Sequence, residues 1–382
     1  MRLLVFVTFF VLLWQYSTAQ VDSISNNITI SLITGSPGDD VYAYFGHTAI
    51  RVQNVASRQD VLYSYGTFDF DTPNFYGKFL QGKLLYMLSI DATPRLFQYY
   101  QYTQRGITEQ VLNLNNIQEE QLVQFLAKNY EPANRFYLYD FFYDNCATVI
   151  RDVFEKEFKI EYQIDTVREV TFRQILQEYV EPRDPWTYFG MDLILGIPTD
   201  KKADFRNQMF IPDYLSQNLA KATLDGKPLL QQSAILLPVS SAVEKKSAIL
   251  FTPMLVTILI LIITVIITFT KNQRLKNRFD RILFSILGIA GLFLLFMWFG
   301  TDHIATKDNW NVLWMNPLYL LFVFGVFRKS EISRRGLLIF YISTLLFVLI
   351  TWGWFAQSFN VAVIPIVIAL IVRCLDRIFR KI

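Results

Sequence analysis

Two side chains of this 382-residue chain have the chemistry of a nucleophile and its base. Cys146 is one of only two cysteines, and His47 is one of only two histidines. Asp144 and Asn145, which precede Cys146, are residue types that cap helices, and apolar residues recur after them at helical spacing. We therefore expect Cys146 in a first helical turn, where free backbone N–H groups and the helix dipole favour a thiolate. A buried structural cysteine is the alternative.

A thiol nucleophile needs a base within hydrogen-bond reach, and a third group commonly orients that base. His47 follows a glycine at the start of a predicted strand, and it is the one imidazole between residues 20 and 248. A histidine in that position can also be a structural hydrogen-bonding residue. An unpaired cysteine and a single histidine in the same domain together favour the nucleophile and base.

The chain divides into three parts by composition. Residues 1–19 have the layout of a secretory signal peptide, residues 20–248 form a mixed polar and apolar domain, and residues 249–382 are dominated by apolar runs. Basic residues fill the connections 271–281 and 328–335 and the C-terminal tail, which predicts that these segments are cytoplasmic and that 20–248 is exported. Five membrane spans are expected near 249–270, 282–300, 310–327, 337–356 and 360–372.

This topology separates the two cysteines. Cys146 is predicted outside and Cys374 at the cytoplasmic edge of the last span, so they cannot form a disulfide. The same separation leaves too few clustered ligands for a zinc site, and no glycine loop suited to phosphate is present, so neither a metal nor a cofactor is expected. The net charge of +3 is explained by the cytoplasmic clusters and does not indicate nucleic acid.

The exported domain is expected to be an α+β domain, because strands cluster early and helices lie around them. Alternating apolar residues bounded by turn residues predict strands, and longer periodic segments predict helices. The strands are expected at 28–33, 47–52, 61–68, 83–90 and 110–114, and the helices at 94–102, 117–130 and 171–179.

A Gly-His pair at the head of a strand, followed much later by Asn-Cys at the head of a helix, resembles the permuted NlpC branch of the papain-like superfamily, which includes lecithin:retinol acyltransferase. A larger set of motifs resembles the Lnb-type bacterial lipoprotein N-acyltransferases, which have an exported cysteine domain ahead of a membrane domain. These motifs are YFGHTAIR at 44–51, YGTFDF at 65–70, PNFY at 73–76, YDNCAT at 143–148 and RD at 151–152.

The resemblance implies transfer of an acyl chain from a phospholipid to the N-terminal amine of a diacylated lipoprotein. It implies a thioester on Cys146, with His47 as general base and then acid, in an inner-membrane protein whose C-terminus is cytoplasmic. The oxyanion would be held by backbone N–H groups at the helix start, with Asn145 as a further donor. Retinol acyltransferase relatives orient the base with a second histidine, which is absent here; Tyr65 is favoured in its place, with Ser64 and Asp69 as alternatives.

Five residues are candidates for binding the lipid substrates. His303, Asn309 and Trp310 lie in a polar loop predicted at the headgroup level, although an interfacial tryptophan anchor is the alternative interpretation of this loop. Arg51 and Arg151 are candidates for contact with lipid phosphate, and the alternative for each is a salt-bridged arginine.

Other functions stay open at this point. A cell-wall peptidase or a phospholipase would use the same fold and the same nucleophile. A non-catalytic membrane assembly factor would instead bury His47 and Cys146 as core residues.

Overall fold

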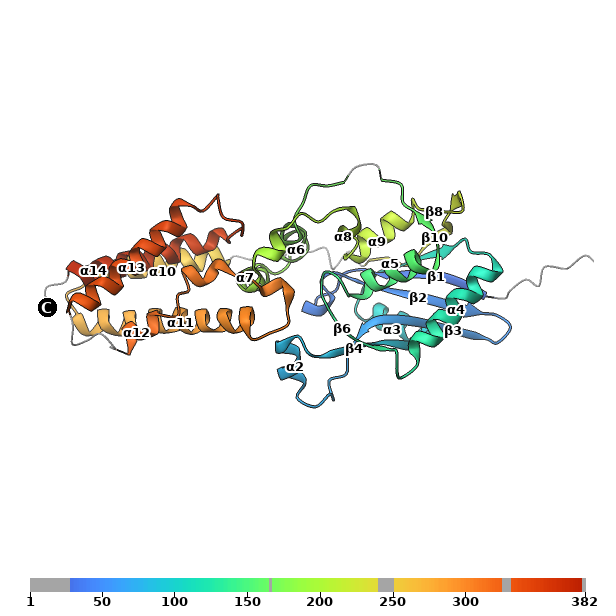
Figure 1. Cartoon of the computed structure of the whole chain (residues 1–382), viewed down its shortest axis with the longest axis horizontal. Helices are drawn as coiled ribbons and strands as arrows, with labels where there is room; N and C mark the ends of the chain where they lie inside the picture. Colours follow the sequence, from blue (N-terminus) through green and yellow to red (C-terminus); the bar gives the residue numbers. More distant parts are fainter. Residues whose placement is uncertain (1–27, 165–166, 240–250, 325–330, 380–382) are drawn as a thin grey trace, which may run out of the picture.

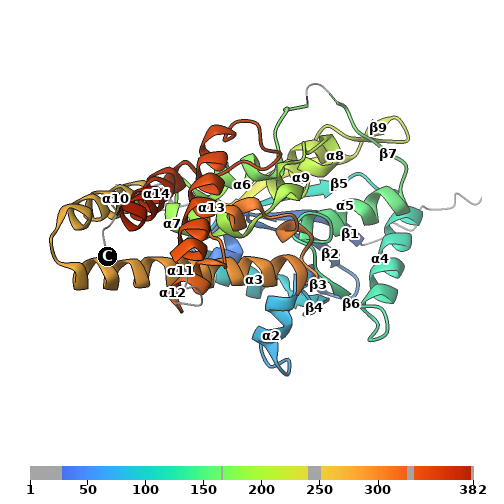
Figure 2. The same cartoon turned by 60° about the vertical axis from the view of Figure 1, so that its left-hand side comes forward.

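The computed structural model describes residues 28–164, 167–239, 251–324 and 331–379, so the expected signal peptide at 1–19 lies outside the described residues. Figure 1 shows two parts along the long axis of the molecule, an N-terminal domain built on a β-sheet and a C-terminal group of helices. Helices α6 (Phe172–Val180) and α7 (Pro185–Ile194) lie between these two parts in Figure 1, and Figure 2 shows the molecule turned by 60°.

The N-terminal domain contains a seven-stranded antiparallel sheet in the order β10-β5-β1-β2-β3-β4-β6. All five expected strands are present, which confirms the α+β expectation. A small three-stranded sheet lies apart from it in the order β7-β8-β9. The strands are β1 (Ile28–Gly35), β2 (His47–Asn54), β3 (Gln59–Thr67), β4 (Leu85–Ala92), β5 (Ile107–Leu112), β6 (Phe136–Leu138), β7 (Ile160–Glu161), β8 (Thr223–Leu224), β9 (Lys227–Pro228) and β10 (Leu230–Leu237).

Alternation along the strands gives the sheet two buried faces. Leu32 and Ile50 point into a core shared with α4 (Asn116–Tyr130), α5 (Cys146–Glu157) and α9 (Pro212–Leu219). On the other face, Ile33 and Ala49 pack with Tyr100 of α3 (Thr93–Tyr102). The remaining short helices of this domain are η1 (Val41–Ala43), α2 (Phe75–Gln81), η2 (Ile197–Asp200) and α8 (Phe205–Gln208).

The C-terminal part contains five α-helices within the described residues, but the third differs from expectation. The span expected at 310–327 is not a continuous helix in its described part, residues 310–324. A 3-10 turn there is followed by Asn316 and Pro317, and proline removes a backbone donor and disfavours helix at the residue before it. The elements are α10 (Pro253–Phe269), α11 (Gln273–Phe299), η3 (Ile304–Thr306), η4 (Trp310–Leu313), α12 (Tyr319–Val323), α13 (Glu331–Ile350), η5 (Val361–Val363) and α14 (Ile364–Phe379).

Helix α11 is longer than the span expected at 282–300. It begins at Gln273, inside the segment expected to be a basic loop, because the side chain of Asn272 caps it and basic residues are good helix formers. Among the described helices, this 27-residue helix is the one long and apolar enough to cross a membrane, and α10 is a shorter apolar helix.

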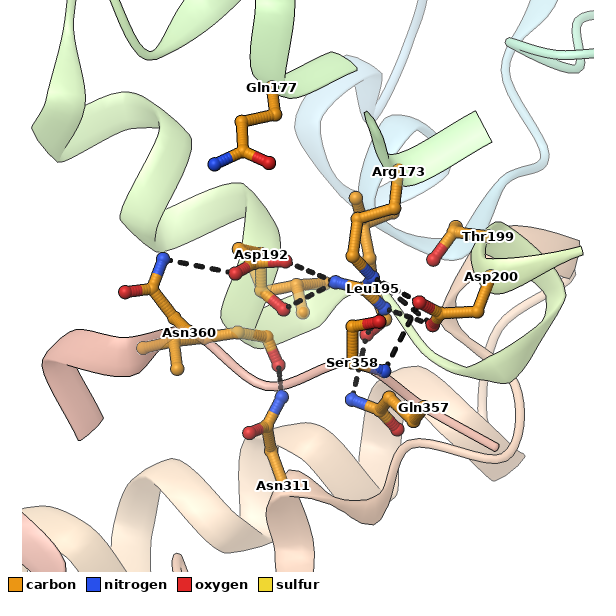
Figure 3. A network of polar contacts seen from close by, with 12 residues as sticks. Arg173, Gln177, Asp192, Leu195, Thr199, Asp200, Asn311, Gln357, Ser358 and Asn360 are labelled. Carbon is orange, nitrogen blue, oxygen red and sulfur yellow. Dashed lines mark hydrogen bonds and ion pairs between the residues drawn. The ribbon is translucent and has the colours of Figure 1, made fainter. Parts of the chain in front are cut away.

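A buried ion network joins the two parts of the chain (Figure 3). Arg173 of α6 lies between two carboxylates, Asp192 of α7 and Asp200 of η2, and all three side chains are buried. The loop before α14 reaches the same carboxylates: Asn360 Nδ2 donates to Asp192 Oδ2 at 3.0 Å, and the backbone N–H of Ser358 donates to Asp200 Oδ1 at 3.1 Å. The loop before α14, in the C-terminal part, therefore donates hydrogen bonds to the carboxylates of Asp192 and Asp200.

Candidate active site

Cys146 is the first residue of α5, as the sequence predicts. Asn145 caps the helix: its Oδ1 accepts from the backbone N–H groups of Ala147 at 2.8 Å and Thr148 at 2.9 Å. In return, the Oγ1 of Thr148 accepts from the backbone N–H of Asn145 at 2.8 Å. This capping box fixes the backbone conformation at the residue that carries the thiol.

The amide of Asn145, which is expected to be an oxyanion donor, has partners within the protein in this structure. Its Nδ2 donates to the carbonyl oxygens of Phe141 and Phe210, both at 2.8 Å. Both amide protons are therefore engaged with backbone, and the side chain is 3% exposed. Asn145 is a positioning residue that ties the start of α5 to the segment before α9.

Asn145→Ala is expected to lower the free energy of unfolding by at least about 2 kcal/mol, because it removes a cap and leaves two buried carbonyl groups without a donor. The control is Asn115→Ala. Asn115 caps α4 in an exposed capping box. Its replacement should therefore lower the free energy of unfolding by only about 1 kcal/mol. Urea unfolding of the two variants measures the difference, and equal losses would contradict the positioning role.

His47 begins β2, where the chain enters the sheet through a tight turn. Gly46 has φ +80°, and a Cβ on it would lie 2.6 Å from the carbonyl oxygen of Gly35, so glycine is required there. Gly35 pairs with His47 in the β1–β2 register. The strand start is thereby held in one position.

Cys146 lies over the start of β2. Helix α5 packs across β2 and β3, and the backbone N–H of Thr48, the residue after His47, is close enough to the Cys146 thiol to act to lower its pKa. Gly66 of β3 is on the other side, and a Cβ on it would lie 3.8 Å from the Cys146 Cβ. The fold therefore places the Cys146 thiol beside the main chain of the residue that follows His47, although Cys146 and His47 are far apart in the sequence.

Desolvation sets the protonation of both groups, although each residue keeps part of its surface exposed. It raises the pKa of the Cys146 thiol to about 11, although the N–H groups of Thr48, Ala147 and Cys146 itself act to lower it. Burial, with a smaller contribution from the charge of Arg105, lowers the pKa of His47 to about 4. The expected preformed thiolate is therefore wrong for the resting state: the helix-start amides act in the predicted direction, but desolvation outweighs them. At neutral pH the pair is a thiol and a neutral imidazole.

Titration tests this resting state. Because the folded pKa of His47 lies below the ordinary value of about 6.5, the imidazole should stay neutral until the pH falls toward 4. With only two histidines in the chain, NMR of the His303→Gln variant follows His47 alone. Alkylation of Cys146 in a Cys374→Ala background should have its midpoint near pH 11. A histidine that titrates at 6.5, with rapid alkylation at pH 7, would exclude the neutral pair.

Arg105 is a neighbour of the site that the sequence analysis missed. Its Nε donates to the carbonyl oxygen of Ser36 at 2.8 Å, and its guanidinium lies 4.2 Å from the centre of the Tyr100 ring. Its Nη2 is buried and has no hydrogen-bond partner in the described part of the chain. A positive charge held here opposes protonation of His47. No local pattern marks this residue, since its place depends on the loop after β1.

Tyr65 does not orient His47 in this structure. Its hydroxyl donates to Asn129 Oδ1 of α4 at 2.6 Å, and its ring lies in the core between the sheet and α5. The alternation of β3 therefore turns this side chain toward α4, where its hydroxyl has a partner other than His47. Of the two alternatives, Asp69 accepts from the backbone N–H of Asp71 at 2.9 Å, and Ser64 is buried within β3.

Both candidate phosphate-binding arginines are engaged within the protein. Arg51 forms ion pairs with Asp60 at 2.6 Å and Glu109 at 2.9 Å, which joins β2 to its surroundings. Arg151 is buried in α5 and pairs with Asp152 at 2.6 Å. The alternative interpretation, a salt-bridged arginine, describes both residues.

The polar loop after α11 joins the two parts of the chain and does not gather around Cys146. Its His303 Nε2 lies 3.0 Å from the carbonyl oxygen of Phe79 in α2. Asn309 is buried, and its Nδ2 donates to two carbonyl groups near the end of α7 at 2.8 and 2.7 Å. The Trp310 ring packs edge-on against Phe355 at 5.0 Å. Asn309 and Trp310 thus have structural contacts, and His303 contacts the N-terminal domain at α2.

Comparison with known families agrees with the two-part architecture. Residues 15–178 match the model of the Lnb N-terminal periplasmic domain, and residues 244–381 match that of the Lnb transmembrane domain. The chain belongs to the Lnb family. No curated protein and no solved structure matches it. The Lnb periplasmic domain thus contains both His47 and Cys146, and the Lnb transmembrane domain contains α10 to α14.

The described residues of this Lnb protein offer no group of three or more histidine, cysteine or acidic side chains placed to hold a metal ion. Both cysteines are free thiols, and Cys374 is buried among the helices of the Lnb transmembrane domain.

Proposed function

We propose that this Lnb protein transfers an acyl chain from a membrane phospholipid, through a thioester on Cys146, to the N-terminal amine of a diacylglyceryl-cysteine lipoprotein. The observation that carries this proposal is the placement of the Cys146 thiol. It stands at a capped helix start, beside the amide that follows His47, in a chain whose C-terminal part is a transmembrane domain. A phospholipid ester is a substrate that such a thiol meets at a membrane.

The first half-reaction forms the thioester. His47 accepts the Cys146 proton as the sulfur attacks the ester carbonyl carbon, and the backbone N–H groups of Cys146 and Thr48 stabilise the oxyanion. The carbon–oxygen bond to glycerol then breaks, and His47 returns the proton to the departing oxygen. The products are the acylated enzyme and a lysophospholipid.

The second half-reaction passes the acyl chain to nitrogen. The neutral amine of the lipoprotein attacks the thioester carbon, and His47 accepts a proton from it. The carbon–sulfur bond breaks as the amide forms, and the proton returns to the Cys146 sulfur. The two steps balance without an oxidant, a reductant or a cofactor. A neutral imidazole, which the lowered pKa of His47 provides at neutral pH, is the form that accepts a proton in each step.

Intact mass spectrometry tests the thioester directly. The full chain in nanodiscs is incubated with one defined phospholipid, and we expect a mass increase of one acyl chain that hydroxylamine removes. A diacylated lipopeptide added afterwards should take up the chain as an amide. Cys374→Ala should behave as the parent protein, and Cys146→Ser should show no adduct. An adduct that persists in Cys146→Ser would overturn the assignment.

The acceptor distinguishes the remaining functions. Release of free fatty acid with no transfer to the lipopeptide would indicate a phospholipase. Cleavage of purified peptidoglycan, without any adduct from phospholipid, would indicate a cell-wall peptidase. An unreactive Cys146 together with a silent Cys146→Ala variant would favour an assembly factor. The positions of the basic segments support an inner-membrane location with a cytoplasmic C-terminus.

A further inference from the structure

Helix α2 presents an exposed aromatic surface. None of its residues is buried, and around it Phe70 is 66%, Tyr76 is 80% and Phe79 is 51% exposed. Exposed apolar residues are common singly, but a contiguous group of large aromatic side chains marks a binding surface. We call this group, with Phe75, the α2 aromatic surface.

The rings of this surface contact one another. Phe75 lies 4.9 Å from Phe70 and is stacked on Phe79 at 6.2 Å between ring centres. Tyr76 packs edge-on against Phe75 at 5.3 Å. These contacts hold the rings as a continuous apolar face, which does not dock on the sheet.

The α2 aromatic surface lies beside the end of the helix that is long enough to span a membrane. Helix α11, which is long enough to span a membrane, ends at Phe299. The backbone N–H of Asp302 donates to the carbonyl oxygen of Gln81 at 2.8 Å, and His303 Nε2 is 3.0 Å from that of Phe79. Figure 1 shows α2 projecting from the domain near this end of α11. A segment fixed so close to the end of a spanning helix faces the headgroups and the outer acyl chains.

A series of ring contacts leads from this surface to the nucleophile. Phe68, which contacts both Phe75 and Phe70, lies 5.4 Å from Tyr86, and Tyr86 is stacked on Tyr139 at 4.4 Å. A Cβ at Gly66 would lie 3.5 Å from the Tyr139 ring and 3.8 Å from the Cys146 Cβ. The aromatic contacts therefore run from the membrane boundary to the residue beside Cys146.

We propose that the α2 aromatic surface inserts into the outer leaflet and binds phospholipid acyl chains, which the aromatic series directs toward Cys146. The second part rests on the proposed acyl transfer, whereas the insertion rests on the transmembrane domain alone. Lys78 of α2 fits this position, since a lysine can lay its stem on an apolar surface and extend its ammonium to lipid phosphates.

Fluorescence tests the insertion without any enzymatic readout. In a Cys146→Ser, Cys374→Ala background, Tyr76→Cys carries an environment-sensitive nitrobenzoxadiazole label, and the full chain is placed in nanodiscs. We expect a blue-shifted emission that nitroxides on lipid acyl chains quench. Ile117→Cys is the control, because Ile117 is 77% exposed on α4 and should remain in water. Equal quenching at the two positions would overturn the insertion, and so would a blue shift that the acyl-chain nitroxides do not quench.

Two acyl donors separate lipid delivery from the chemistry. Phe70→Ser with Tyr76→Ser should slow acylation of Cys146 by phospholipid about tenfold or more, and acylation by a soluble short-chain nitrophenyl ester should be unchanged. Ile117→Ser should change neither rate. Loss of both rates in the double variant, or of neither, would contradict acyl-chain delivery by this surface. If the parent protein reacts with neither donor, the proposed function fails, and the fluorescence result still decides the insertion.

Discussion

Cys146→Ser is expected to leave a folded protein whose rate of acyl transfer falls by about a thousandfold or more, equivalent to at least about 4 kcal/mol in the barrier. A serine hydroxyl is much harder to deprotonate than a thiol. His47 is a weak base at this site because burial lowers its pKa to about 4, so it would not activate the oxygen to the same degree. Transfer of a radiolabelled acyl chain from phospholipid to a diacylated lipopeptide measures the loss.

Two variants make this result specific. The rate of acyl transfer by His47→Gln should fall to a similar extent, since the substitution removes the base and leaves the strand start intact. Cys374→Ala should retain most of its activity, because Cys374 is buried in the transmembrane domain away from the site. Thermal unfolding must show that all three variants are folded. A Cys146→Ser protein that keeps a tenth or more of the parental rate would show that the thiol is not the nucleophile.

Arg173→Leu is expected to lower the free energy of unfolding by about 3–5 kcal/mol, because it leaves two buried carboxylates without their cation. This is the largest stability effect of any single substitution considered. Asp192 and Asp200 are 4% and 6% exposed. Burial already raises the pKa of Asp192 against the opposing effect of Arg173. The loop before α14 binds both carboxylates, so the junction between the two domains should loosen.

Arg168→Leu is the matched control for this prediction. Arg168 pairs with Glu178 at 2.6 Å, but both side chains are more than two-fifths exposed, and such pairs contribute less than about 1 kcal/mol. Unfolding in the same detergent, together with protease cleavage of the segments between the domains, compares the two variants. Equal midpoints and equal cleavage rates would show that the buried network does not hold the domains together.

Local patterns predicted much of the fold, because alternation and capping act over a few residues. The five expected strands and the start of α5 at Cys146 depend on such patterns. The prediction of the third span was based on the high average hydropathy of the segment. That average does not register Pro317, which interrupts the helix where a span would have to continue. The basic segment at the start of α11 was predicted to be a loop but is helical, since its charge indicates a side of the membrane and does not prevent a helix.

The site could be predicted only in part, because the partners of its polar groups come from distant segments. Cys146 and His47 follow from their rarity and their places on a helix and a strand. The sequence did not predict that the amide of Asn145 donates to the carbonyl group of Phe210, or that the hydroxyl of Tyr65 donates to Asn129. Neither contact leaves a trace near those residues in the sequence. Asn309 illustrates the same limit, since a polar side chain in a loop can be fully buried where two domains meet.

The neutral state of the thiol has a further consequence for a protein whose domain lies in the periplasm. Disulfide exchange and peroxide oxidation both require the thiolate, and a thiol with a pKa of about 11 supplies very little of it at neutral pH. Cys146 has no second cysteine in its own domain to form a protecting disulfide. The desolvation that keeps the Cys146 thiol protonated therefore also protects it chemically in an oxidising compartment, where an ionised cysteine would be oxidised.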